Sequence, residues 1–185
     1  MLNWLNGRST TTHKAEELYG KVVAAARQPA FYGPGRVADT PEGRFELVAL
    51  HLFLIIERVK DVKPEGTEIA RHMIEAFVTD MDDCMREMGV GDLTVPKRVK
   101  RAAAGFYERA GAFREGLSNP SNKALDEAVG KYTYQGKSRA DQHRVLAAYV
   151  RMSSAALAKA KPDDNIVGSF NFPRPENFPD PEIQP

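Results

Sequence analysis

The chain has 185 residues, of which 42% are apolar and 28% are charged, and its formal net charge is +1. These values are typical of a soluble globular protein with one sizeable core, and the low net charge argues against a general nucleic-acid binder. The single cysteine, Cys84, excludes a disulfide framework and a cysteine-rich metal site. The longest apolar run covers ten positions, residues 47–56, whereas a membrane-spanning helix needs ~20. We therefore expect a soluble protein.

Apolar residues recur at three- and four-residue spacing along most of the chain, which predicts six helices. Their predicted ranges are residues 11–27, 40–61, 67–88, 96–117, 119–132 and 138–159. A turn is predicted at Gln135 and Gly136, and the spacing of Ser138 and Asp141 predicts a capping box at the start of the sixth helix. The sequence shows no internal repeat and no sustained strand alternation. It predicts an all-α fold, a single helical domain of about six main helices.

The second predicted helix has the clearest start signal. Thr40, Pro41 and Glu42 supply a cap, a proline at the first helical position and an early acid. Residues 47–56 are apolar nearly all round, which predicts a central buried helix. His51 lies on this helix, and we expect a core histidine with satisfied hydrogen bonds rather than a ligand.

The third predicted helix is rich in methionine, and the fourth contains two glycines. The third holds four of the six methionines at helical spacing. Such a stripe indicates core packing more often than a binding surface, although methionine also adapts to varied partners. On the fourth, Gly105 and Gly111 cost helix stability unless they permit a close neighbour.

The last part of the chain changes character. Residues 162–185 hold six of the twelve prolines and three of the nine phenylalanines. Proline excludes a long helix or strand here, whereas aromatic residues are scarce in disordered chains. We predict a helical domain at residues 1–161 followed by an extended or partly disordered C-terminal tail, with residues 166–172 docked on the body.

One stretch carries most of the unexplained charge. Residues 80–101 read DMDDCMREMGVGDLTVPKRVKR, an acidic helix end followed directly by a basic helix start. Both blocks oppose the helix macrodipole, which favours cations near a C-terminus and anions near an N-terminus. Either the two blocks pair across a turn between antiparallel helices, or a partner contacts both signs. The stretch indicates a recognition surface rather than an active site.

No pattern indicates catalysis. Glu68, His72 and Glu75 share a predicted helix, but a di-iron site needs a Glu and a His three residues apart on two helices. Asp80 and Asp82 alternate like the start of a calcium loop that lacks its glycine and its distal glutamate. There is no phosphate-binding loop and no nucleophile elbow. The sequence therefore predicts no catalytic residue, no metal site and no cofactor.

Three stretches carry a family resemblance. They are residues 19–32, residues 39–46 leading into Leu50 and His51, and residues 80–82 with 86–93 (REMGVGDL), Lys97, Lys100, Phe106 and Tyr107. On these residues the chain resembles the ubiquinol–cytochrome c chaperones, and the turn in the third stretch is the most distinctive part. The resemblance spans residues 19–109 and fades after Leu117.

This resemblance implies a non-enzymatic assembly factor with an all-helical fold. Such a protein binds newly made cytochrome b and assists assembly of respiratory complex III (cytochrome bc1). Similar mitochondrial relatives work with a small partner protein and at the ribosome. The resemblance therefore implies both as partners. Residues 1–17 lack a secretory signal and are short for a transit peptide, so the chain resembles a bacterial member. The implied location is the cytoplasm, with at most peripheral contact with the inner face of the inner membrane (the matrix side in a eukaryote).

A soluble protein can hold an apolar client helix in a groove whose charged rim fixes the orientation of the helix. The apolar contacts that we expect are Phe31, Tyr32, Met81, Met85, Phe106 and Tyr107, and the expected rim is Asp82, Asp83, Arg86, Lys97, Arg98 and Arg101. For the apolar residues the alternative is core packing, and for the charged residues it is a surface pair within the chain. Two other functions stay open: a carrier of quinone or lipid in a helical pocket, and a metal-dependent enzyme.

Overall fold

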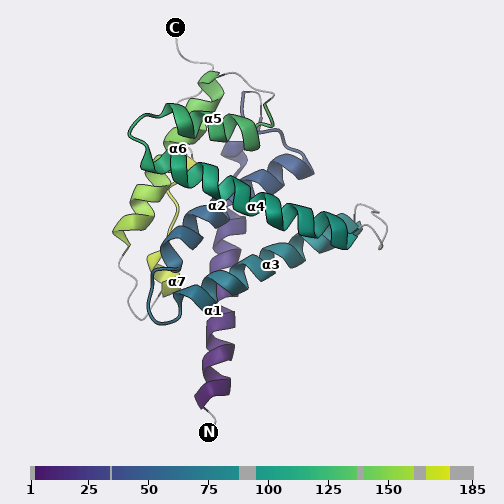
Figure 1. Ribbon diagram of the computed structural model, residues 1–185, viewed down its shortest axis with the longest axis vertical. Helices are drawn as coiled ribbons and strands as arrows, with labels where there is room; N and C mark the ends of the chain where they lie inside the picture. Colours follow the sequence, from purple (N-terminus) through teal and green to yellow (C-terminus); the bar gives the residue numbers. More distant parts are fainter. Residues whose placement is uncertain (1–2, 34, 88–94, 137–139, 161–165, 176–185) are drawn as a thin grey trace.

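Helices account for nearly all of the regular structure (Figure 1). The computed structural model describes residues 3–33, 35–87, 95–136, 140–160 and 166–175. Its elements are α1 (Asn3–Ala26), η1 (Pro29–Phe31), α2 (Pro41–Val59), α3 (Gly66–Glu87), α4 (Val95–Ser118), α5 (Lys123–Tyr132), α6 (Ala140–Lys159) and α7 (Ile166–Ser169). These described ranges contain no strand, so the predicted all-α class is confirmed.

The second helix, α2, lies at the centre of the core, as the sequence predicts. Its residues from Leu47 to Ile55 are all buried, and the helix packs against α1, α3, α4 and α6. The predicted start is also confirmed, because the Thr40 side chain accepts a hydrogen bond from the backbone N–H of Gly43 at 3.2 Å. Burial of apolar surface is the dominant favourable contribution to folding, and residues 47–55 of α2 are buried on all sides.

Helices α3 and α4 lie side by side and extend away from the rest of the molecule (Figure 1). We call the extending part the arm, made of residues 76–87 of α3 and 95–107 of α4. Met73 and Met81 on α3 are 0% and 7% exposed. The prediction that these methionines belong to the core is therefore confirmed.

The two glycines singled out on α4 have different surroundings. A Cβ atom at Gly105 would lie 2.6 Å from an Nη1 atom of Arg109, so this glycine leaves room for the guanidinium group. A Cβ atom at Gly111 would have no atom within 4 Å. Gly111 faces solvent, so no close neighbour offsets its cost to the helix.

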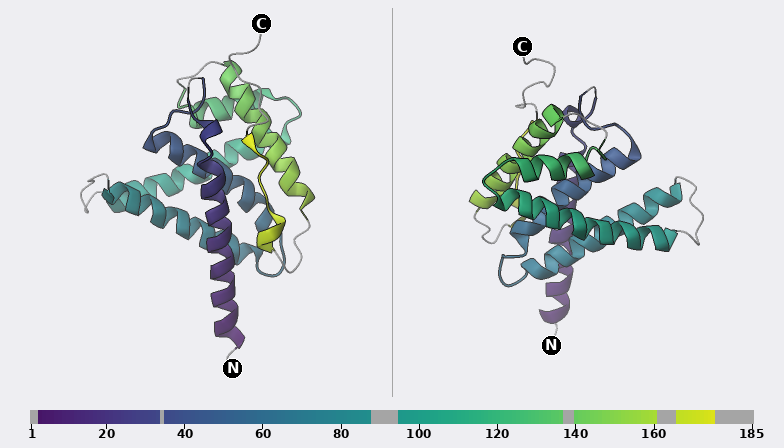
Figure 2. Two further views of the ribbon diagram at one scale, coloured as in Figure 1. Left: turned by 180° about the vertical axis from the view of Figure 1, so that it is seen from behind. Right: turned by 45° about the horizontal axis from the view of Figure 1, so that its top comes forward.

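Two helix starts differ from the prediction. Helix α1 begins at Asn3, earlier than the predicted residue 11, and its first turns project from the body (Figures 1 and 2). Helix α5 begins at Lys123 rather than residue 119, after a bend. In this bend the Arg151 guanidinium donates to the carbonyl oxygens of Asn119 and Ser121 at 3.1 and 3.2 Å, which holds them outside a helical path.

The predicted turn before α6 is confirmed. Gln135 and Gly136 both have positive φ angles, 54° and 68°. This left-handed conformation suits glycine and ends the preceding helical segment. Ser138, the predicted cap of α6, lies outside the residues that the structure describes.

The chain after α6 docks on the body in the described range. Ile166 and Phe170 are 2% and 1% exposed, and the segment runs beside α1 (Figure 2). The predicted docking of residues 166–172 is therefore confirmed, while the boundary between a domain at 1–161 and a tail at 162–185 stays a prediction. No helix among the described residues is long and apolar enough to cross a membrane.

Candidate interaction surface

Two ion pairs fix α4 to the central helix. Arg109 donates to both carboxylate oxygens of Glu46 on α2, at 2.7 and 2.5 Å, and Glu46 is only 6% exposed. Hydrogen bonds to Glu46 raise the pKa of Arg109. Further along α4, Arg114 makes the same two-bond contact with Glu57, at 2.9 and 2.7 Å, on the surface. The part of α4 that follows residue 107 is thereby held on the body, and the arm lies before it.

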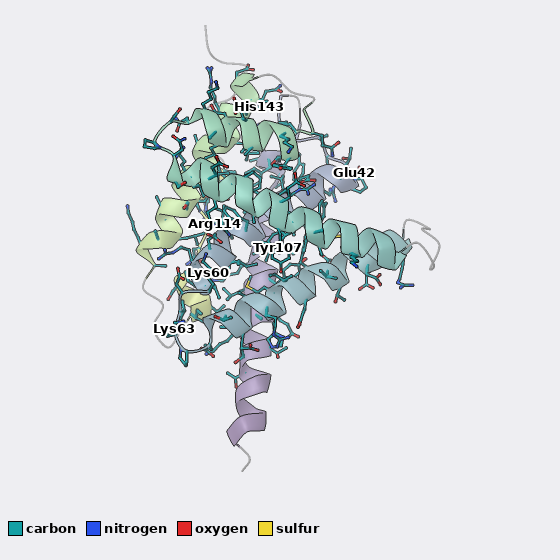
Figure 3. All side chains as sticks on the ribbon, in the orientation of Figure 1. Glu42, Lys60, Lys63, Tyr107, Arg114 and His143 are labelled. Carbon is teal, nitrogen blue, oxygen red and sulfur yellow. The ribbon has the colours of Figure 1, made fainter. Side chains whose placement is uncertain are left out.

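A row of aromatic rings leads from the core to the surface of the arm. Phe45 on α2 stacks on Phe77 of α3 at 5.5 Å between ring centroids, and Phe77 contacts Phe106 of α4 at 5.7 Å. Phe106 in turn meets Tyr107 edge-on at 5.8 Å. Tyr107 is 61% exposed and lies where α4 passes over α3 (Figure 3). A large exposed ring on a rigid aromatic support is well placed for contact with a partner.

A groove runs between α1 and α3 on another side of the arm. Its volume is about 800 Å³, and it is open to solvent. The lining carries three carboxylates, Glu16, Asp80 and Asp83, and the cation Arg27. Tyr19 donates to the Asp80 carboxylate at 2.8 Å, and burial raises the pKa of this tyrosine. The groove is therefore acidic over a floor of small and apolar side chains.

The acidic end of α3 has partners within the chain. Asp80 bonds Tyr19 of α1, and Asp82 accepts a hydrogen bond from Arg86 one turn later at 2.7 Å. These contacts offset the unfavourable position of the two carboxylates near the C-terminus of α3. Asp83 is exposed and faces the groove. The pairing across the turn that the sequence left open involves side chains outside the described ones.

The structure places the predicted contact residues in two separate regions. Phe31 is 5% exposed and packs on His51 and Tyr149 rather than on the arm. The exposed position expected for Phe31 is therefore wrong. Tyr32 is half-buried, and its hydroxyl donates to the Ala26 carbonyl oxygen at 2.7 Å. Both residues belong to the connection between α1 and α2.

On the arm, the predicted set divides by exposure. Met81 and Phe106 are 7% and 3% exposed, which is core packing, and Tyr107 is open to solvent. Asp82 and Arg86 form the pair within α3, and Asp83 is exposed. The side chains of four predicted residues lie outside those that the structure describes, so their roles stay predictions: Met85, Lys97, Arg98 and Arg101.

The buried histidine has the environment that the sequence predicts. His51 Nδ1 donates to the Leu47 carbonyl oxygen at 2.7 Å, and Nε2 accepts from the Tyr149 hydroxyl at 2.8 Å. Burial lowers the pKa of His51 to about 4, which keeps the ring neutral at pH 7. Within the described residues, no group of three or more His, Cys, Asp or Glu side chains could hold a metal ion.

Sequence reasoning missed two polar contacts at this surface. A charged residue at position 46, directly before the apolar run of α2, was a usable signal, because a buried carboxylate requires a partner. The partner itself, Arg109, is 63 residues away and could not be named. The bond between Tyr19 and Asp80 joins residues 61 positions apart and had no local signal.

Comparisons with known proteins agree with this architecture. The crystal structure of the Cbp3 homolog from Brucella abortus is similar to this chain, with a TM-score of 0.84 and 31% sequence identity. The match covers 97% of this chain and 100% of that one. A comparison with curated proteins returned no match. The fold thus defines the class, an all-α single-domain protein.

A family model narrows the class further. The model, described as ubiquinol-cytochrome C chaperone, matches residues 35–172, most of the chain. This chain therefore belongs to the ubiquinol–cytochrome c chaperone family, which confirms the resemblance seen in the sequence.

Proposed function

We propose that this protein is an assembly chaperone that binds newly made cytochrome b and assists assembly of respiratory complex III, the cytochrome bc1 complex, without catalysing a reaction. The observation that carries the proposal is membership of the ubiquinol–cytochrome c chaperone family over residues 35–172. The proposed place of action is the cytoplasmic face of the inner membrane, where a membrane protein such as cytochrome b is inserted.

The arm supplies the chemistry that such a client needs. A helix of a membrane protein presents an apolar face, and the loops at its ends carry charge. Tyr107 offers an exposed apolar ring on α4, and Asp82, Asp83 and Arg86 on α3 add charges of both signs to the arm. Rim charges of this kind speed encounter and fix orientation more than they raise affinity.

The client-contact set is accordingly narrower than the sequence predicts. We keep Tyr107 as the apolar contact, with Asp82, Asp83 and Arg86 in the rim. Phe31, Met81 and Phe106 are assigned to packing because each is buried. The remaining members of the proposed set are Met85, Lys97, Arg98 and Arg101.

The experiment is an affinity purification of the tagged chain from detergent-solubilised membranes of its own host, with mass spectrometry of the bound proteins. We expect enrichment of cytochrome b, and we expect the cytochrome b absorbance of membranes to fall when the gene is deleted. Ribosomal proteins or a small partner protein in the same eluate would add these to the proposed binding partners. A deletion strain with normal complex III and no cytochrome b in the eluate would contradict it.

Two surface variants test the position of the contact. Tyr107→Ser should reduce capture of cytochrome b while changing stability by less than about 0.5 kcal/mol, because the ring is 61% exposed. The matched control is Met152→Ser on α6, which changes the other large exposed apolar side chain among the described residues. Equal capture by wild type and Tyr107→Ser would move the contact away from the arm.

The second candidate function, a carrier of quinone or lipid, requires an enclosed apolar cavity. Two grooves, one of about 800 Å³ between α1 and α3 and one of about 440 Å³ between α1 and residues 170–175, are both open and partly polar. Native mass spectrometry of the purified chain separates the candidates. A stoichiometric lipid or quinone that survives purification would favour the carrier.

A further inference from the structure

The C-terminal segment is held on α1 largely through its backbone. We call residues 166–175 the strap; they run between α1 and α6 (Figure 2). The Lys21 ammonium group of α1 donates to the carbonyl oxygens of Val167 and Phe170, at 2.5 and 3.1 Å, and to Asn171 Oδ1 at 3.3 Å. Val167 lies in the helical turn α7 and Phe170 directly follows that turn, so Lys21 binds carbonyl oxygens at its C-terminal end, where a cation is favoured.

Aromatic side chains of the strap enter the body. Phe172 lies edge-on to the ring of His51, with 4.8 Å between ring centroids, and Phe170 is 1% exposed. His51 is also contacted by Phe31 and Tyr149. We call the surface made by these three residues and Lys21 the slot.

The slot presents apolar faces because its polar atoms are satisfied internally. His51 bonds the Leu47 carbonyl oxygen and the Tyr149 hydroxyl, which leaves ring faces and edges for a ligand. Phe172 contacts the slot through His51, Phe170 two positions earlier is buried, and Pro173 follows. The strap thus presents a ligand pattern, a helical turn followed by aromatic–any–aromatic–proline.

Space remains beside the docked strap. A groove of about 440 Å³ is bordered by Lys21 and Ala24 on α1, by Gln28 just after this helix, and by the strap from Phe170 to Pro175. Burial of a few apolar side chains favours docking, whereas ordering of about ten residues opposes it by a similar amount. A segment held by this balance can exchange with a competitor that offers the same groups.

We propose that the slot is a binding site for a protein segment of the strap's type, a helical turn followed by aromatic–any–aromatic–proline, and that the strap is its built-in occupant. A partner segment takes the site when it displaces residues 170–172 from His51 and Lys21. The strap then sets the minimum affinity that a partner segment needs, because a tethered occupant competes at a high effective concentration. This site is separate from the arm and does not depend on the proposed client.

A labelled peptide of the strap sequence, IVGSFNFPRP, tests the site on the full-length chain by fluorescence anisotropy. In the wild type the tethered strap should make binding weak. In the variant carrying Phe170→Ser and Phe172→Ser, the slot is vacated and the peptide should bind at least about tenfold more tightly. A peptide with both phenylalanines replaced by serine is the control and should not bind.

Two further measurements decide the proposal. Adding Lys21→Ala to the vacated variant should remove most of the gain, because the same amine would hold the added peptide. Equal peptide binding by the wild type and the vacated variant would overturn the proposal. Hydrogen exchange of the wild type gives a test that needs no variant: strap amides should exchange much faster than the amides of α2. Strap amides that exchange only with global unfolding would overturn it too.

Discussion

The slot and the arm lie on two sides of α1 and present their aromatic residues in opposite ways. The slot directs aromatic rings inward, keeps its histidine neutral and is covered by the chain itself. The arm directs aromatic rings outward to Tyr107, and an ion pair at its base fixes α4 to α2. The aromatic rings of the slot need a cover in water, whereas a charged rim remains solvated. The difference indicates that the arm is ready for a partner and that the slot must first be opened.

The strongest test of this contrast is removal of Arg109, the half-buried cation at the base of the arm. Arg109→Met leaves the Glu46 carboxylate, 6% exposed, without its partner. We expect a loss of about 3–5 kcal/mol in the free energy of unfolding, measured by urea denaturation. The double variant with Glu46→Leu should recover much of this loss, because no charge stays buried. A single variant that costs less than about 1 kcal/mol would show that the pair is dispensable.

The contribution of the slot to stability should depend on pH, whereas that of the base of the arm depends on the Arg109 charge. The pKa of His51 is about 4 in the fold and 6.5 ordinarily, so between these values the unfolded chain binds a proton that the fold excludes. Stability therefore falls as the pH falls from 6.5 towards 4, by about 3 kcal/mol in all. His51→Gln should remove this contribution, measured as the difference between two stability–pH profiles. Parallel profiles would contradict the buried neutral ring.

A smaller effect is expected where α1 meets the arm. Tyr19→Phe removes the hydroxyl that donates to Asp80, and a hydrogen bond of this kind contributes about 0.5–1.5 kcal/mol. The midpoint of thermal unfolding should fall slightly, without loss of helical circular dichroism. The matched control is Tyr134→Phe, whose hydroxyl makes a longer bond of 3.3 Å to the Gln142 carbonyl oxygen.

The smallest effect belongs to the exposed ion pair of α4. Arg114 lies on the surface close to Lys60, and both contact Glu57 (Figure 3). The Arg114 guanidinium lowers the pKa of Glu57, but solvent screens the pair. Arg114→Ala should cost about 0–1 kcal/mol, and this cost should shrink in 1 M salt. A loss of stability as large as that of Arg109→Met would show that burial does not decide how much each ion pair contributes.

Much of the fold could be predicted because helices leave local signals. The cap at Thr40 and the apolar run of α2 marked the central helix, and the phenylalanines after Pro162 indicated docking. The first residues of α1 carry no apolar stripe, so its early start could not be predicted. The delayed start of α5 depends on Arg151, a residue far along the chain.

The candidate site was less predictable because exposure is set by tertiary packing. The glycines and prolines around Phe31 indicated an exposed loop, yet contacts with His51 and Tyr149 bury the ring. Tyr107 was found through a resemblance and not through its surroundings. Periodicity alone could not distinguish it from its buried neighbour Phe106.

Helix α6 links two places that the rest of the chain keeps apart. Tyr149 forms part of the slot, and Arg151 holds the bend between α4 and α5. A rotation of α6 about its own axis would therefore move both. Met152 follows directly and is 40% exposed, so its methyl group offers a sharp NMR resonance on the same helix turn. Its chemical shift would report on slot occupancy and on the seating of α4 in a single spectrum.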